Sequence, residues 1–194
     1  MNTNIPSLIA VDNTFQATAR KLSTHHDLAA KTSRQTLETI MSILTGTLQA
    51  VNLTDDQLTN VAALIETSLQ YRDAFLIASL NPQATEDDLT TCTEHPHSQE
   101  AIRLITGTLD KFFNIKDYTD QTRVNRAIHL LDQLTRITGM TPQLCATRAY
   151  LSWASHDIEQ TKQYASMTAE LDKENTLAAL LLAALHLNIN PKTK

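Results

Sequence analysis

The sequence is poor in glycine and proline, and this scarcity excludes several kinds of functional site. Its 194 residues include three glycines and five prolines. Neither a glycine-rich phosphate loop nor a G-x-S-x-G nucleophile motif can be assembled from so few glycines. A fold made of many tight turns would also need more of both residues, and no segment shows a convincing strand pattern. The composition therefore favours an all-α protein without a nucleotide-binding motif.

Cysteine and long apolar runs are equally scarce. The two cysteines, Cys92 and Cys145, are too few for a disulfide framework. The longest apolar run, Leu177–Leu185, falls far short of the ~20 residues that span a bilayer. The N-terminus lacks the basic and apolar segments of a signal peptide. We therefore expect a cytoplasmic protein with reduced thiols and no membrane association.

Clustered positive charge is missing as well. The formal net charge is −5, and residues 53–100 carry nine acidic side chains and one basic side chain, Arg72. Binding to phosphate groups needs clustered lysine and arginine, so we expect no direct contact with nucleic acid. An acidic segment of this kind attracts basic partners, but a solvated acidic face is the simpler explanation.

Helical periodicity is what the sequence has in abundance. Apolar side chains recur at three- and four-residue steps through residues 34–51 and again through residues 55–80. Thr54 and Gln57 form a capping-box pattern before the second of these segments. The whole pattern predicts an all-α fold: a single domain over residues 1–194 with about eight helices in an antiparallel bundle. Residues 1–11 are expected to be a loose lead-in.

Residues 141–191 resemble one and a half units of a tetratricopeptide repeat. Small residues fall at expected helix crossings, and Glu170–Asn175 stands where such repeats have a turn. Ala183 follows Ala149 by 34 residues, which is the length of one repeat. His156 and Lys173 replace the glycine and proline expected at the turns. The resemblance implies a tetratricopeptide-like helical hairpin at the C-terminus, too short for a solenoid of at least three units.

The same region is also similar to an uncharacterised actinobacterial family, a domain of unknown function. The similar segments are Ala149–Asp157, an apolar helix with tryptophan, then Leu177–Leu181, and finally Pro191. Tyr71–Leu76 is similar to an Arg-Asp-Ala-hydrophobic segment in the middle of that family, so the resemblance covers about residues 54–191. It implies a helical fold and no established activity. The chain departs from the family's glycines and proline at His156, Lys173 and Asn188.

Cys92, His95 and His97 are the candidate metal ligands. The pattern C-x2-H-x-H places three potential zinc ligands in one loop. No second group of ligands follows at a recognisable spacing, so we favour a loop without metal and expect no cofactor. His25, His26 and Asp27 could supply a general base with an orienting carboxylate. Adjacent side chains point apart on a helix, however, and we expect a solvated connection there.

Arg72 and Asp73 interrupt an apolar helical stretch. Neighbouring side chains on a helix do not face each other, so we expect each to reach a different helix or solvent. Buried charges need partners. We therefore favour a structural ion pair that joins the two halves of the chain, with a ligand-contacting arginine as the alternative.

These observations predict a non-enzymatic interaction or scaffold module that binds a protein partner or a second copy of itself. No catalytic residue is proposed. The candidate interaction residues are Arg72, Asp73, Leu181 and Leu185, the last two on a leucine-rich final helix whose Leu180 is a further candidate. A metal-binding protein or enzyme that uses the Cys92–His97 loop is the alternative.

Overall fold

The computed structural model describes residues 13–24 and 26–191. These residues form ten α-helices and one short 3-10 helix, and no strand occurs among them. The expectation of an all-α fold is confirmed, whereas the expected number of about eight helices is too low. The helices are α1 Asn13–Thr24, α2 His26–Thr45, η1 Ala50–Asn52, α3 Asp55–Thr67, α4 Leu69–Leu80, α5 Glu86–Glu94, α6 Gln99–Asn114, α7 Gln121–Thr138, α8 Pro142–Ala154, α9 Ile158–Leu171 and α10 Thr176–His186.

Two helices end earlier than their apolar periodicity indicates. Residues 55–80 form α3 and α4 instead of one helix, because Ser68 adopts an extended conformation with φ −137° and ψ 114°. The helix expected over residues 34–51 ends at Thr45, where Gly46 takes a φ of 86°. A left-handed glycine after the last turn is a common way to terminate a helix. Both breaks leave the three- and four-residue spacing intact, so periodicity alone does not detect them.

The capping box that the sequence predicts before α3 is confirmed, whereas the end of α7 and the start of α8 are formed in other ways. Thr54 accepts a hydrogen bond from the amide of Gln57, and the Gln57 side chain accepts one from the amide of Thr54, which completes the capping box. Gly139 ends α7 with a φ of 76°. The hydroxyl of Thr141, in contrast, does not cap its own helix α8.

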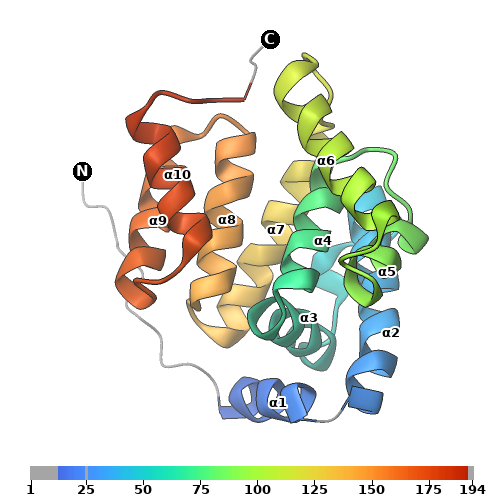
Figure 1. The fold of residues 1–194 in the computed structure, drawn as a ribbon. Coiled ribbons are helices and arrows are strands. Elements are labelled where there is room, and N and C mark those ends of the chain that lie inside the picture. The colour runs from blue at the N-terminus through green and yellow to red at the C-terminus, as the bar shows by residue number, and fades with distance from the viewer. Residues whose placement is uncertain (1–12, 25, 192–194) are drawn as a thin grey trace.

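Two adjoining clusters of buried side chains hold the helices together. The larger cluster has its side chains mainly on α1 to α8. The smaller cluster lies between α4, α6, α8, α9 and α10 and contains Leu80, Phe112, Trp153 and Leu181. Figure 1 shows α8, α9 and α10 on one side of the molecule and α2, α4 and α5 on the other. The smaller cluster therefore supports the end of the molecule at which the C-terminal segment lies.

Lead-in residues 1–11 and His25 lie outside the described residues, and so do the side chains of His26 and Asp27. The prediction of a base and an orienting carboxylate there remains a prediction. No helix in the described part of the chain is both long enough and apolar enough to cross a membrane.

Glu66, near the end of α3, caps the start of α8 from a distance in sequence. Its Oε2 accepts a hydrogen bond from the hydroxyl of Thr141 at 2.6 Å and another from the amide of Gln143 at 3.1 Å. A carboxylate at a helix N-terminus satisfies amides that have no partner within the helix. Burial raises the pKa of Glu66 above its ordinary value, and the hydrogen bonds to Thr141 and Gln143 offset part of that rise.

We expect the substitution Glu66→Gln to change how stability depends on pH. Because the pKa of Glu66 is raised in the folded state, its contribution is complete below its ordinary pKa of 4.5 and is lost as the pH rises through the folded-state pKa. Glutamine keeps an acceptor oxygen for Thr141 and cannot ionise. Urea denaturation at about pH 4 and about pH 7 should show the wild type losing stability relative to Glu66→Gln as the pH rises.

The matched variant Glu66→Ala removes the acceptor as well as the charge. Loss of a helix cap costs about 1 kcal/mol, so this variant should be less stable than Glu66→Gln at both pH values. A stability difference between wild type and Glu66→Gln that does not change with pH would contradict the proposed burial of the carboxylate.

Candidate functional site

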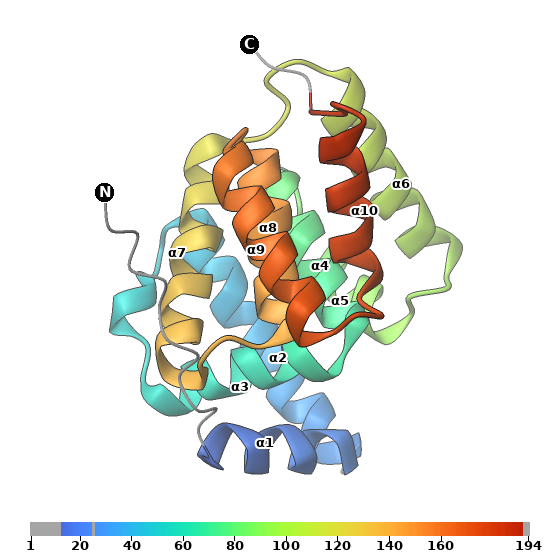
Figure 2. The same ribbon diagram turned by 90° about the vertical axis from the view of Figure 1, so that its left-hand side faces the viewer.

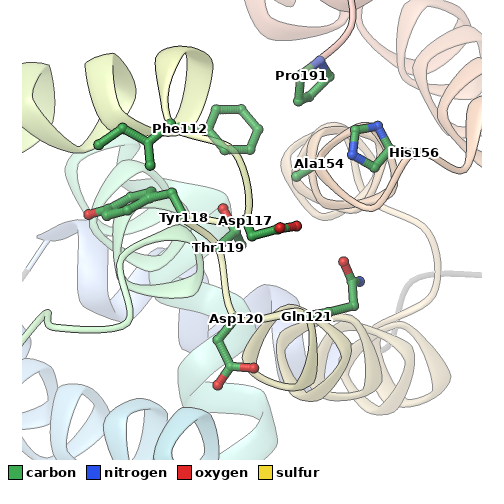
Figure 3. Close-up of a pocket in the computed structure, with 10 residues that line it drawn as sticks. Phe112, Asp117, Tyr118, Thr119, Asp120, Gln121, Ala154, His156 and Pro191 are labelled. Carbon is green, nitrogen blue, oxygen red and sulfur yellow. The ribbon is translucent and has the colours of Figure 1, made fainter. Parts of the chain in front are cut away.

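An open cavity of about 620 Å³ lies at the end of the molecule where α6, α8 and α10 finish. Its walls come from the connection between α6 and α7, from the turn between α8 and α9, and from the segment after α10 (Figure 3). The lining residues are Phe112, Ile115, Asp117, Tyr118, Thr119, Asp120, Gln121, Ala154, His156 and Pro191.

Three residues with left-handed backbone gather at this end. Asp117, His156 and Asn188 have φ values of 58°, 61° and 53°, and no other non-glycine residue within 13–24 and 26–191 has a positive φ. Asp117 and His156 line the cavity, and Asn188 precedes Pro191 by three positions. Aspartate, asparagine and histidine tolerate this conformation better than most residues, yet it still carries strain. Such strained positions collect at binding sites.

His156 takes its conformation because it closes the end of α8. Its amide donates to the carbonyl of Trp153 at 3.0 Å, and the next amide, of Asp157, donates to the carbonyl of Ser152 at 2.9 Å. These two bonds are a Schellman motif, in which glycine is the usual left-handed residue. The carboxylate of Asp157 then accepts from the amide of Gln160 and starts α9.

Trp153 packs against Phe112, one of the residues that line the cavity. Its ring lies 6.0 Å from that of Phe112 and 5.7 Å from that of Phe113. Its Nε1 donates to the carbonyl of Ile189 at 3.2 Å, so one buried side chain fixes both α6 and the C-terminal segment. Tyr150 packs on its other side at 5.6 Å. These contacts make Trp153 and Tyr150 packing residues at this end of the molecule.

The polar groups of the cavity come mainly from residues 117–121. Figure 3 shows the carboxylate of Asp117 and the side-chain amide of Gln121 directed into the cavity, whereas the carboxylate of Asp120 points away. Asp120 instead accepts from the amide of Thr122 at 2.9 Å and caps α7. The Nε2 of Gln121 donates to the Oγ of Ser155 at 3.0 Å, which joins α7 to the turn after α8.

Two hydroxyl groups on the same connection are buried. Neither the hydroxyl of Tyr118 nor that of Thr119 makes a well-formed hydrogen bond within the described residues. Burial raises the pKa of Tyr118, and the nearby hydroxyl of Thr108 offsets part of the rise. Buried polar atoms usually have partners in proteins, so the hydroxyl of Thr119 has hydrogen-bonding capacity that the described chain does not use.

The candidate metal ligands are not brought together. Cys92 is buried in the larger core cluster, whereas His95 and His97 are exposed beyond the end of α5. Among the described residues, no three histidine, cysteine, aspartate or glutamate side chains lie close enough to hold a metal ion. Burial raises the pKa of the Cys92 thiol to about 11 and that of the Cys145 thiol to about 12, with nearby carboxylates adding to both shifts.

Arg72 and Asp73 contact each other, contrary to the expectation that adjacent residues on a helix point apart. The Nη2 of Arg72 lies 2.7 Å from the Oδ1 of Asp73 and its Nε lies 2.9 Å from the same oxygen. The long guanidinium side chain can fold back over its neighbour, which shorter side chains cannot. Its Nη1 donates to the Oε1 of Gln143 at 2.8 Å. Arg72 thus connects α4 to α8, and this favours the structural role over contact with a ligand.

The expectation that Leu181 is an interaction residue is also corrected. Only 2% of its surface is exposed, and it belongs to the smaller core cluster. Leu185 is half-buried against the same cluster. Leu180, one residue earlier, is 66% exposed. Adjacent residues on a helix point about 100° apart. The leucine-rich sequence of α10 therefore did not indicate which leucines reach the surface.

Most residues of the cavity were not identified from the sequence. The segment Asn114–Thr119 reads as a plain connection, and the features that make it part of a cavity are its left-handed backbone and its neighbours from other helices. The local signals were the departures at His156 and Asn188, where non-glycine residues occupy positions expected to be glycine. No other spacing in the sequence points to this end of the molecule.

Comparison of the chain with protein-family models, with curated proteins and with solved structures finds no match. The resemblance to the actinobacterial family therefore remains a prediction. The function of the cavity has to be argued from its own geometry and chemistry.

We expect the backbone at His156 to be the strained part of this turn, and paired substitutions can test it. His156→Gly and His156→Ala both remove the imidazole, but only glycine accepts a φ of 61° without a steric cost. The glycine variant should be more stable than the alanine variant by about 1 kcal/mol, measured by urea denaturation. An alanine variant as stable as the glycine variant would show that the turn is not left-handed in solution.

Proposed function

We propose that this protein is a non-enzymatic interaction module whose partner protein docks at the end that holds the cavity. The observation that carries the proposal is a set of exposed apolar side chains around that cavity. Ile115, which lines it, is 52% exposed, and Phe113 and Ile189 are 37% and 48% exposed. Phe113 and Ile189 both contact Trp153, so both lie next to the same buried side chain. Exposed apolar groups next to a cavity are typical of docking sites.

The tetratricopeptide-like hairpin is part of the same proposal. Helices α8 and α9 lie side by side, with α10 against them (Figure 2). Small side chains are buried in α8 and α9, which lets two helices approach closely, as in helical repeats. They are Ala149, Thr161, Ala165 and Thr168. In this interpretation the hairpin is the scaffold, and its turn at His156 presents one wall of the docking site.

The chemistry of the nucleophilic side chains supports a binding role over an enzymatic one. A thiol reacts as the thiolate, and the raised pKa values of Cys92 and Cys145, about 11 and about 12, keep both protonated at neutral pH. Both thiols are also buried away from the cavity lining. The partner is expected to meet the protein in the cytoplasm, as the composition of the chain predicts.

The docking proposal predicts that Ile115→Asp abolishes capture of the partner from an extract of the native host. The matched control is Leu69→Asp, because Leu69 is 53% exposed at the first position of α4 and does not line the cavity. Quantitative mass spectrometry should find a protein that is enriched with the wild type and with Leu69→Asp and is lost with Ile115→Asp. The thermal midpoints of all three proteins should agree.

A protein that both variants retain, or both lose, would not depend on the cavity end. Either outcome contradicts docking at this site. Because Ile115 and Leu69 differ by only one percentage point in exposure, a general effect of adding charge to an exposed apolar position would appear in both variants.

Association with a second copy of the chain is the other candidate, and α10 favours it. Leu180 is 66% exposed and Leu187, just after the helix, is 64% exposed. We expect Leu180→Glu to shift a wild-type dimer to a monomer, measured by size-exclusion chromatography with light scattering, while Leu69→Asp leaves the mass unchanged. A monomeric wild type at all accessible concentrations would exclude self-association.

A further inference from the structure

We propose that the cavity binds an organic cation with N–H donors, a protonated amine or a guanidinium, supplied by a lysine or arginine side chain of the docked partner. This inference rests on the proposed docking function and names the group that enters the cavity. It depends on the charge directed into the cavity, on the acceptor atoms around it and on its apolar walls.

The carboxylate of Asp117 is the charged side chain that Figure 3 shows directed into the cavity. None of the ten lining residues is a lysine or an arginine. The Nε2 of Gln121 is already engaged with Ser155 and with Asn125, so its carbonyl oxygen is the free end of that side chain. The side chains of Asp117 and Gln121 therefore present acceptors to a ligand, while the neutral imidazole of His156 has one donor and one acceptor nitrogen. Ammonium and guanidinium groups offer donors only and match the acceptors.

The helix ends add to the same preference. Three helices, α6, α8 and α10, finish at the cavity, and a helix C-terminus carries partial negative charge. Two helices, α7 and α9, begin there, but Asp120 and Asp157 cap their first amides and compensate the positive ends. The balance of these partial charges favours a cation.

Two cations near the cavity, among the described residues, have partners of their own. The Nζ of Lys111 lies 5.7 Å from the centre of the Tyr118 ring. Arg123 is buried, and its Nε donates to the carbonyl of Ala78 at 2.6 Å. Lys116 is exposed next to Asp117 and is not among the lining residues. Asp117 is thus available to a ligand, while Asp120, which caps α7 and faces Arg123, is less so.

The apolar part of the lining fits the rest of a long basic side chain. Phe112, Ala154 and Pro191 are buried wall residues, and lysine and arginine side chains lay their methylene groups along such surfaces. Phe112 and Tyr118 are the aromatic lining residues, and an aromatic ring attracts a cation that comes close to its face. A cavity of about 620 Å³ is large enough for one basic side chain with part of the adjoining peptide.

The experiment is an NMR titration of the full chain at about 0.15 M salt, where exposed charges are screened. The probes are Nα-acetyl-lysine methylamide, Nα-acetyl-arginine methylamide and, as the uncharged analogue, Nα,Nε-diacetyl-lysine methylamide. We expect at least one charged probe to give saturable shifts of the amides in residues 115–121 and 154–157. The diacetylated probe should give no saturable shift.

Asp117→Asn is the test variant, and two asparagine variants with the same charge change are its controls. Asp117→Asn should weaken binding of the charged probe at least fivefold, because the loss of one charge about 4 Å away has that effect even at the dielectric constant of water. Asparagine tolerates the left-handed backbone there, so the turn is kept. Asp120→Asn retains a good helix cap and should have a smaller effect. Asp55→Asn, in the first turn of α3, should have none.

Equal weakening by Asp117→Asn and Asp55→Asn, or shifts that do not saturate, would overturn the proposal. Spermidine serves as a free polyamine, and binding at least tenfold tighter than capped lysine would overturn the assignment to a partner's side chain. Capture that depends on Ile115 without cation binding would leave the docking function standing and refute only this inference. Cation binding without such capture would refute the docking function instead.

Discussion

The indole of Trp153 is the side chain on which this end of the structure depends. It packs against Phe112 and Phe113 of α6, against Tyr150 of α8, and holds the C-terminal segment through its bond to the carbonyl of Ile189. Aromatic contacts of this kind contribute about 0.5–1.5 kcal/mol each beyond the burial of area. The walls of the cavity come from segments that are far apart in the sequence, and Trp153 is the point at which these segments meet.

Much of the fold could be predicted from the sequence, because helix formation follows local rules. Apolar periodicity locates the helices, and the capping residues Thr54 and Gln57 mark a boundary that the structure confirms. The breaks at Ser68 and Gly46 were missed because they do not disturb that periodicity. The role of Glu66 was also missed, since its partners at the start of α8 lie 75 and 77 residues away. Contacts at such separations are not encoded in local spacing.

The candidate site could be predicted much less well, for the same physical reason. Its residues share no spacing, because a cavity at helix ends is made by the relative positions of three chain segments. The contact between Arg72 and Asp73 was not predicted either, because adjacent positions on a helix diverge. The arginine side chain is long enough to reach its neighbour nonetheless. The leucine-rich last helix indicated an interface. The packing of α10 on the smaller core cluster buries Leu181 and leaves Leu180 exposed, and the sequence did not show this.

The energies of the charge–charge and cation–aromatic contacts explain why a cation-binding cavity would act within a larger interface. Two unit charges 4 Å apart attract by about 1 kcal/mol in bulk water and by about 4 kcal/mol near a protein surface, where the effective dielectric constant is about 20. A contact between a cation and an exposed aromatic ring adds about 0.5–1 kcal/mol. Together these terms reach only an affinity on the order of millimolar. The exposed side chains of Phe113, Ile115 and Ile189 offer the apolar area that can supply the remainder. Charge in the cavity then selects the partner and sets its register, while burial of the surrounding side chains provides most of the affinity.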